Sequence, residues 1–162
     1  MNPPTRSVSI IVPTFHECAN LRPLVERIFA ATAAAGLDAE VILVDDDSRD
    51  GTEEAAAELA RTHPLRCVVR RGARGLSGAV LEGLRHARHD LFVVMDGDLQ
   101  HPPERIPDLV HRFDDPGTDF VIASRYMPGG QIAEAWSAGR RWASRIACLL
   151  ARPLAPLTDP MS

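Results

Sequence analysis

Several features that define other protein classes are missing from this sequence of 162 residues. No run of 18 apolar residues occurs in it, so the chain holds no segment typical of a membrane-spanning helix. Its opening, MNPPTRSVSIIVPTF, contains too short an apolar stretch for a signal peptide, and we expect none. Lysine is absent and all 18 basic residues are arginine, a bias from which no mechanism follows.

Cysteine is scarce and positive charge does not predominate. The three cysteines, Cys18, Cys67 and Cys148, show no CxxC spacing, which argues against a disulfide framework or a zinc site and favours reduced thiols. A formal net charge of −4 argues against non-specific nucleic-acid binding, which usually needs a basic surface. Length and composition, with 45% hydrophobic and 25% charged residues, predict one ordinary globular domain over residues 1–162.

Short apolar runs alternate with segments of helical periodicity along the chain. Apolar and β-branched runs predict strands over 7–13, 41–45, 67–70, 91–95 and 120–124. Helical spacing predicts helices over 17–35, 53–63, 75–88 and 103–113, the second of them capped by Asp50 or Thr52. This alternation predicts an α/β fold with a mostly parallel sheet covered by helices on both faces.

The unusual residues follow the predicted strands, where open parallel sheets bind their ligands. Segment 13–17 reads PTFHE, 45–48 reads DDDS, 96–103 reads DGDLQHPP and 124–126 reads SRY. The three aspartates at 45–47 fit two interpretations. They contact a cation, N–H donors or sugar hydroxyls, or they cap a helix and form a turn, as Asp often does.

Asp96 and Asp98 are the strongest candidates for binding a metal. Two carboxylates two residues apart, on a turn after a buried strand, are placed to face one divalent ion, and Gln100 offers a further oxygen. Oxygen ligands suit Mg²⁺ or Mn²⁺, and Mg²⁺ commonly bridges carboxylates to substrate phosphates. Gly97 between them allows the backbone to approach a ligand closely.

Two histidines and a glycine-rich loop complete the candidates. His16 and His101 flank these segments, and we interpret them as turn or outer residues rather than zinc ligands, because no other His, Cys or Glu stands at ligand spacing. The loop 70–78, RRGARGLSG, lacks both GxGxxG and GxxxxGK[ST], which argues against a dinucleotide-binding oxidoreductase and a P-loop protein. It lies near a diphosphate, or it is only a flexible loop before a helix.

Taken in order, these segments resemble the family 2 glycosyltransferases of the inverting GT-A class, and within them the polyprenyl-phosphate sugar transferases of the dolichyl-phosphate mannose synthase type. The matching segments are VPTFHE (12–17), VDDDSRDGT (44–52), RGLSGAVLEGLRHA (74–87), VMDGDLQHPPE (94–104), ASRYMPGG (123–130) and TDPMS (158–162). They span nearly the whole chain in family order. Members of the family continue beyond the last motif, so we expect an incomplete catalytic domain.

The resemblance implies roles for individual residues. Contacts with the nucleotide base and ribose fall on Pro13, Phe15, Glu17, Val44 and Asp46. The family often has Tyr in place of Phe15 and Asn in place of His16, so a hydroxyl is lost while the flat ring remains. The other implied sites are the donor site at Asp96, Gly97 and Asp98, the metal site at Asp98 and Gln100, and the acceptor-phosphate site at Arg125 and Arg140, with Asp96, Asp98 and Arg125 the catalytic set.

The implied reaction is an inverting transfer of a hexose, mannose favoured, from a nucleotide-diphosphate sugar such as GDP-mannose to a polyprenyl (dolichyl-type) phosphate. Mg²⁺ or Mn²⁺ would assist the departing diphosphate, and an anionic lipid phosphate needs no general base. Two alternatives stay open. One is a UDP-sugar transferase acting on undecaprenyl phosphate or a glycan, and the other is a fragment that binds nucleotide sugar without catalysis.

Residues 137–157 mix apolar side chains with arginines. Trp142, Ile146 and Leu149 alternate with Arg141 and Arg145. The pattern fits an amphipathic helix on a membrane surface, and equally a helix packed on the sheet with a solvated arginine face. Together with a lipid acceptor, it leads us to expect a cytoplasmic protein that is peripheral at the cytoplasmic face of a membrane.

Overall fold

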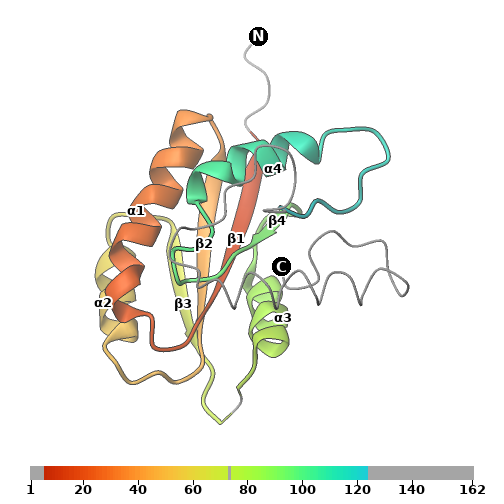
Figure 1. The fold of residues 1–162 in the computed structure, drawn as a ribbon. Coiled ribbons are helices and arrows are strands. Elements are labelled where there is room, and N and C mark those ends of the chain that lie inside the picture. Colours follow the sequence, from red (N-terminus) through yellow and green to blue (C-terminus); the bar gives the residue numbers. More distant parts are fainter. Residues whose placement is uncertain (1–5, 73, 124–162) are drawn as a thin grey trace, which may run out of the picture. The chain divides into compact units, whose positions relative to one another are not determined.

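A computed structural model describes residues 6–72 and 74–123 (Figure 1). The chain forms two compact units, Met1–Asp108 and Leu109–Ser162. The first unit contains the sheet and three of the α-helices in full. The helix α4 (Ile106–Arg112) spans the boundary.

Four parallel strands build the sheet in the order β3-β2-β1-β4. They are β1 (Ser7–Thr14), β2 (Asp38–Asp45), β3 (Leu65–Val69) and β4 (Phe92–Val94). The central pair, β1 and β2, is in register from Ser7 with Asp38 to Thr14 with Asp45. Because all four strands run the same way, their carboxyl ends meet at one edge, which confirms the predicted parallel α/β sheet.

Helices cover both faces of this sheet (Figure 1). The helices α1 (Cys18–Ala34) and α2 (Thr52–Leu59) lie on one face and α3 (Leu76–His86) lies on the other. The helical spacing of α1 predicts a buried stripe of Leu21, Leu24, Val25, Ile28 and Phe29. The first four are buried, whereas Phe29 is half-buried and Thr32 is buried in addition. The core lies between these helices and the central strands, where Ile10, Ile11, Val12, Ile42 and Leu43 are fully buried.

The approach of α3 to the sheet depends on a glycine. A Cβ atom at Gly83 would lie only 2.5 Å from Cγ2 of Ile11 and 3.3 Å from Cγ2 of Val44. Real Cβ atoms do not come so close, so any side chain here would force the helix away from β1 and β2. Gly83 therefore sets the distance between α3 and the carboxyl half of the central strands.

Two sequence predictions about the fold are wrong. Residues 120–123 of the predicted fifth strand do not form a strand. Residues 109–123, the described part of the second unit, contain no other strand with which they could pair. An apolar run alone does not make a strand without a neighbour to share its backbone hydrogen bonds. The N-cap of α2 is Gly51, with φ 95°, because Asp50 instead accepts the N–H of Thr52 in a turn.

The two described cysteines, Cys18 and Cys67, are free thiols. Burial raises the pKa of Cys67 to about 12, so this thiol stays protonated near neutral pH. In the described part of the chain, no helix has the length and apolarity that crossing a bilayer requires. Cys148 and the amphipathic segment 137–157 lie outside the described residues.

Candidate functional site

Strained backbone gathers at the carboxyl edge of the sheet. Among the described residues, four that are not glycine adopt positive φ: His16 (61°), Asp47 (55°), Arg49 (53°) and Leu99 (62°). All four lie in the loops after β1, β2 and β4. Such conformations cost on the order of 1–3 kcal/mol each and cluster at binding and active sites. This edge is therefore the candidate site.

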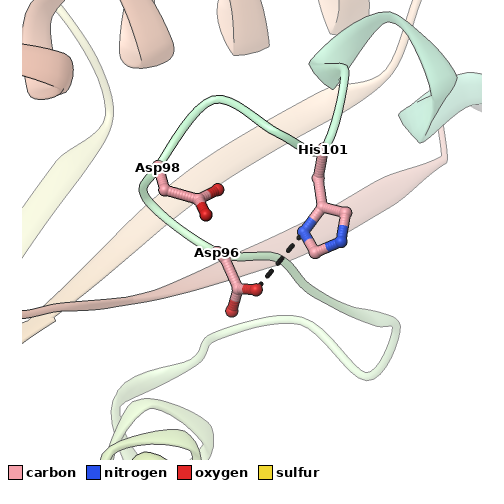
Figure 2. A group of neighbouring side chains, drawn as sticks. All are labelled: Asp96, Asp98 and His101. Atoms are coloured by element: carbon pink, nitrogen blue, oxygen red, sulfur yellow. Dashed lines mark ion pairs between the residues drawn. The ribbon is translucent and has the colours of Figure 1, made fainter. Parts of the chain in front are cut away.

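The loop after β4 brings Asp96, Asp98 and His101 together (Figure 2). One ligand atom from each residue lies within 4.8 Å of the others. Nδ1 of His101 lies 3.5 Å from Oδ2 of Asp96, yet this nitrogen is shielded from solvent and has no hydrogen-bond partner. A shielded polar atom without a partner is costly, and a divalent cation between the three groups would satisfy it. The donor set therefore fits a divalent metal.

The neighbours of this cluster hold the loop in place. The backbone N–H of Gln100 donates to Oδ1 of Asp98 at 3.0 Å, while the Gln100 residue itself is exposed. Gly97 is buried, and a Cβ atom there would lie 3.3 Å from Cγ2 of Thr14 and 3.6 Å from the carbonyl oxygen of Pro13. The backbone of Gly97 thus packs closely against the end of β1. This contact brings the loop after β4 next to the loop after β1.

The three consecutive aspartates have three different surroundings. Asp45, 2% exposed, accepts from the N–H of Ser48 at 2.9 Å and also from the Ser48 hydroxyl. It thereby builds the turn after β2, as the turn-forming interpretation predicts. Asp47 is paired with Arg49 at 2.7 Å, and the hydrogen bond from Arg49 lowers the pKa of the Asp47 carboxyl.

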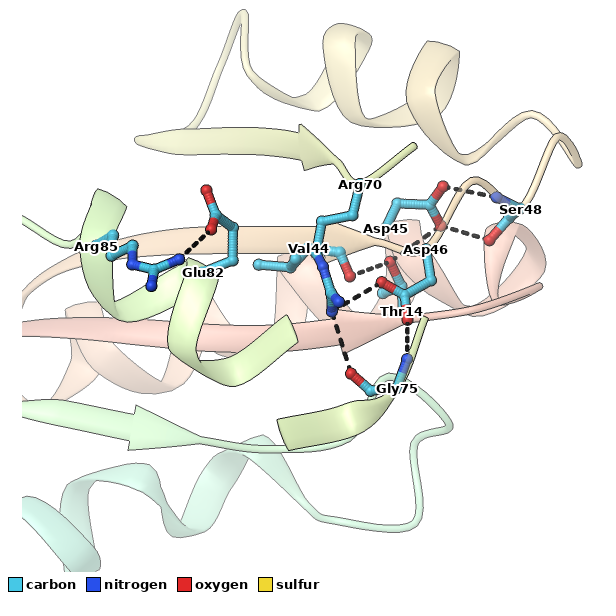
Figure 3. Close-up of polar contacts among 9 residues, drawn as sticks. All are labelled: Thr14, Val44, Asp45, Asp46, Ser48, Arg70, Gly75, Glu82 and Arg85. Carbon is cyan, nitrogen blue, oxygen red and sulfur yellow. Dashed lines mark hydrogen bonds and ion pairs between the residues drawn. The ribbon is translucent and has the colours of Figure 1, made fainter. Parts of the chain in front are cut away.

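Asp46 is buried and faces the loop before α3 (Figure 3). Its Oδ2 accepts from the N–H of Gly75 at 2.7 Å, and its Oδ1 lies 3.1 Å from Nη1 of Arg70. The pair links the end of β2 to residues 70–75, and the 12% exposed Arg70 side chain is itself largely buried. Oδ2 of Asp46 is therefore hydrogen-bonded, whereas Oδ1 faces the Arg70 guanidinium as an ion pair, is shielded from solvent and has no hydrogen-bond partner.

The remaining predicted base and ribose contacts lie around the end of β1. Phe15 is 43% exposed, and Cζ of Arg74 lies 4.8 Å from the centre of its ring. Glu17 precedes α1 and accepts from Nδ2 of Asn20 at 2.6 Å. Pro13 is half-buried within β1. Val44 is fully buried: its side chain faces α3 and its carbonyl oxygen accepts from the Thr14 hydroxyl at 3.4 Å.

Comparisons with known proteins identify the chain. Residues 9–160 match the protein family described as glycosyl transferase family 2. The chain belongs to this family. The match covers nearly all of the sequence and agrees with the parallel sheet described above.

Three family 2 relatives are named dolichol-phosphate mannosyltransferase. The protein from Pyrococcus furiosus is 43% identical over 96% of this chain and 44% of its own length. The protein from Mycosarcoma maydis is 44% identical over 98% of this chain and 55% of its own. The Saccharomyces cerevisiae protein is 43% identical over 95% and 58%. The chain thus spans about half the length of these curated relatives.

Solved structures share the fold. A mannosyltransferase from Pyrobaculum calidifontis, solved in complex with GDP-Man and Mn²⁺, is 32% identical, with a TM-score of 0.59 over 67% of this chain and 32% of that one. A glucosyl-3-phosphoglycerate synthase from Mycobacterium tuberculosis, 22% identical, has a TM-score of 0.68 over 97% of this chain and 55% of that one. The second likeness concerns the fold alone.

The cluster changes the interpretation of His101, which the sequence suggested to be a turn or outer residue, and two arginines join the site without a role assigned from the sequence. His101 stands three residues after Asp98, and the turn at Leu99, with its positive φ, brings its imidazole close to the Asp98 carboxylate. Arg70 and Arg74 were part of the glycine-rich loop, but nothing in their spacing indicated Asp46 or Phe15 as partners. The predicted acceptor residues Arg125 and Arg140 lie outside the described residues.

Proposed function

We propose that this chain carries the donor-binding half of an inverting, metal-dependent mannosyltransferase that acts on a polyprenyl phosphate. The observation that carries the proposal is the Asp96, Asp98 and His101 cluster at the carboxyl edge of a family 2 sheet. Three relatives at 43–44% identity named dolichol-phosphate mannosyltransferase support the sugar and the acceptor.

The donor diphosphate would lie over the loop after β4. Asp96, Asp98 and His101 would hold Mg²⁺ or Mn²⁺ there, with the side-chain oxygen of Gln100 a fourth candidate ligand. The bound cation would supply Lewis-acid assistance to the departing nucleoside diphosphate. The neighbour solved with GDP-Man and Mn²⁺ supports the use of a divalent cation.

The nucleoside would lie over the end of β1. The exposed ring of Phe15 offers a flat face for a base, and the carboxylate of Glu17, two residues further along the chain, could accept hydrogen bonds from the ribose hydroxyls. The half-buried Pro13 would line the same region, and the fully buried Val44 would support it from within the sheet. These residues orient the donor and leave the sugar near the metal cluster.

The acceptor phosphate would be oriented by Arg125 and Arg140, because guanidinium groups match phosphate geometry. A lipid phosphate is an anion near neutral pH, so it attacks the anomeric carbon without a general base. The diphosphate then leaves from the opposite side, which inverts that carbon. A lipid acceptor requires a membrane surface, and we propose that the protein works at its cytoplasmic face with residues 137–157 resting on it.

One relative favours a second candidate function. An undecaprenyl-phosphate 4-deoxy-4-formamido-L-arabinose transferase from Shewanella sediminis is 39% identical over 70% of this chain and 35% of its own length. It supports an undecaprenyl phosphate acceptor with a different sugar donor. Its lower identity and coverage leave mannosyl transfer as the first proposal.

A transfer assay tests the proposal. The chain is incubated with Mn²⁺, dolichyl phosphate and either radiolabelled GDP-mannose or radiolabelled UDP-glucose, and label in the lipid extract is counted. We expect label from GDP-mannose only, abolished in Asp98→Asn and unchanged in Asp108→Asn, an exposed carboxylate paired with Arg105. Label from UDP-glucose alone would contradict the mannose donor and favour the different sugar donor of the second candidate. Metal-dependent donor binding without any transfer would mark the chain as a binding fragment.

A further inference from the structure

A bidentate ion pair joins α1 to the 3₁₀ helix η1 (Pro103–Arg105), which follows the loop after β4, and the proposed reaction does not use it. Nε of Arg27 donates to Oε1 of Glu104 at 2.8 Å, and Nη2 of Arg27 donates to Oε2 at 2.8 Å. Two parallel hydrogen bonds from a planar guanidinium fix the orientation of a carboxylate as well as its position. The Arg27–Glu104 pair therefore fixes one point of η1 against α1.

The Arg27–Glu104 pair is too exposed to serve mainly as a stabiliser of the whole fold. The two side chains are 41% and 55% exposed, and exposed ion pairs usually add little to the free energy of unfolding. The helix η1 already packs against α1, and Pro103 and the neighbouring Ile106 are buried. What the pair adds to this packing is a defined orientation of the chain at Glu104.

A stiff segment connects Glu104 to His101. Only Pro102 and Pro103 stand between them. Proline fixes its own φ at about −65° and restricts the conformation of the residue before it, and Pro102 has φ −71°. Since proline has no N–H, neither residue donates a backbone hydrogen bond that could hold the segment. A shift of Glu104 is therefore passed on to His101.

The sheet holds the other end of the loop after β4. The N–H of Met95 donates to the carbonyl of Ile11 at 3.1 Å, and the backbone of Gly97 packs against the end of β1. No such contact holds the imidazole of His101 at Nδ1, which lies 3.5 Å from Oδ2 of Asp96 without a hydrogen bond. The place of this ring therefore depends on the backbone on its η1 side.

We propose that Arg27 and Glu104 are positioning residues for the metal cluster. The pair fixes η1, and the two prolines extend this constraint to His101, whose imidazole is thereby kept facing Asp96 and Asp98 (Figure 2). Both carboxylate oxygens of Glu104 accept from Arg27, so Glu104 acts through His101 and is not itself a ligand. This inference rests on the proposed function, since it needs a bound cation.

Removal of Arg27 separates positioning from simple electrostatics. A positive charge repels a cation, so by charge alone the loss of this guanidinium would leave Mn²⁺ binding unchanged or tighter. Loss of a positioning residue would weaken Mn²⁺ binding instead. Removal of Glu104 weakens Mn²⁺ binding under both accounts, and Arg27→Met is therefore the informative variant.

Titration of the chain with Mn²⁺ alone, followed by the electron paramagnetic resonance signal of the free ion, measures the affinity. We expect Arg27→Met to bind Mn²⁺ about tenfold more weakly, the usual effect of losing a group that orients a metal ligand. Arg22→Met is the matched control, because it removes an equal charge from α1 and a similarly exposed ion pair with Glu58 at 3.2 Å. The control should bind Mn²⁺ as wild type does or more tightly. Equal or tighter binding by Arg27→Met would overturn the proposal.

Pulsed electron paramagnetic resonance of the Mn²⁺-saturated proteins tests whether the effect reaches His101. We expect ¹⁴N modulation from the imidazole in wild type and in Arg22→Met, and weaker modulation in Arg27→Met. A general loss of stability would lower the affinity without changing this signature. Full modulation in Arg27→Met would overturn the proposal, and so would its absence in wild type, because His101 would then have no contact with the ion.

Conservative and exchanged variants test whether the two residues act as a pair. Arg27→Lys keeps the charge but replaces two fixed donors by a single ammonium, so it should recover only part of the affinity. The double variant Arg27→Glu with Glu104→Arg restores opposite charges across the same gap and should bind Mn²⁺ more tightly than either single variant. A double variant that binds no better than the single ones would show independent effects and overturn the proposal.

Urea unfolding and the wild-type titration complete the test. The unfolding midpoints of Arg27→Met and Arg22→Met should agree closely, since each loses one exposed ion pair. If Arg27→Met does not fold, Arg27→Lys takes its place in both resonance experiments. If wild type binds no Mn²⁺ with or without GDP, the proposed metal site itself fails and the positioning role falls with it. If wild type binds Mn²⁺ and Arg27→Met binds it equally well, the proposed function stands and only the positioning role is overturned.

Discussion

Nδ1 of His101 lies 3.5 Å from Oδ2 of Asp96 in the loop after β4, shielded from solvent and without a hydrogen-bond partner. Carboxylates alone suit Mg²⁺ and Mn²⁺ alike, whereas imidazole is a ligand of transition metals. A nitrogen ligand in this cluster would therefore shift its preference from Mg²⁺ toward Mn²⁺.

His101→Ala should weaken Mn²⁺ binding by about tenfold or more and change Mg²⁺ binding less. Pulsed electron paramagnetic resonance of the Mn²⁺-loaded chain gives a direct readout, because ¹⁴N modulation reports a bound imidazole. We expect this modulation in wild type and in His86→Ala, a histidine on α3 paired with Glu82, and its loss in His101→Ala. Wild-type protein that binds Mn²⁺ without ¹⁴N modulation would exclude His101 as a ligand.

Phe15 should contribute to donor affinity through its ring face. Phe15→Ala removes the exposed ring over which Arg74 lies, and we expect about tenfold weaker GDP binding with little change for pyrophosphate. Phe15→Tyr keeps the face and should bind GDP at least as well as wild type. Titration calorimetry measures both, and an Ala variant with wild-type affinity would show that the base lies elsewhere.

Glu40 should make the stability of the sheet depend on pH. Burial opposes its ionisation, but the Ser9 hydroxyl and the backbone and side chain of Arg88 donate to it and together lower the pKa of this carboxyl below 4.5. A folded-state pKa below the unfolded one means that the stabilisation is complete above about pH 4.5 and is lost as pH falls through the folded value.

Glu40→Gln therefore should cost about 2 kcal/mol at pH 7, the value of hydrogen bonds to a charged group. The variant should also lose stability less steeply than wild type between pH 5 and pH 3, since one protonation step is removed. Urea unfolding at pH 7, 5, 4 and 3 gives both quantities. Parallel curves for the two proteins would show that Glu40 is not a source of the acid sensitivity.

Gly83→Ala should destabilise the protein although alanine favours helices. The new methyl group would meet Cγ2 of Ile11 at 2.5 Å in the core, and overpacking of this kind costs about 1–3 kcal/mol. Ser77→Ala on the exposed side of α3 should be neutral or stabilising. Urea unfolding of both compares them, and a Gly83→Ala protein more stable than wild type would mean that α3 does not pack on Ile11 so closely.

Much of the fold could be predicted from two local patterns in the sequence, apolar runs and helical spacing of apolar residues. The run at Val41 to Asp45 is apolar because β2 is covered on both faces, and the spacing of Leu21 to Ile28 follows one face of α1. The apolar run from Phe120 led to a wrong strand prediction because a strand also needs a neighbouring strand to pair with. Such pairing joins residues far apart in the sequence, so a short segment does not reveal it.

The position of the candidate site could be predicted because acidic residues follow the strands. The separate roles of neighbouring aspartates could not. Asp45 and Asp46 are adjacent and chemically identical. One builds a turn with Ser48, while the other is held by Arg70 and Gly75. That difference arises because Arg70 and Gly75 lie against the end of β2 in the folded chain. Their spacing along the sequence does not reveal this contact. The contribution of His101 likewise depends on the turn made at Leu99.

Metal-dependent donor binding is the central claim, and titration of the chain with GDP-mannose, with and without Mn²⁺, tests it most directly. UDP-glucose and UDP-GlcNAc serve as competing donors, Asp98→Ala as the site variant and Asp108→Ala as the exposed acidic control. We predict that GDP-mannose binds wild type and the control only with Mn²⁺, and does not bind Asp98→Ala. Binding that is indifferent to Mn²⁺ and to Asp98 would contradict the account.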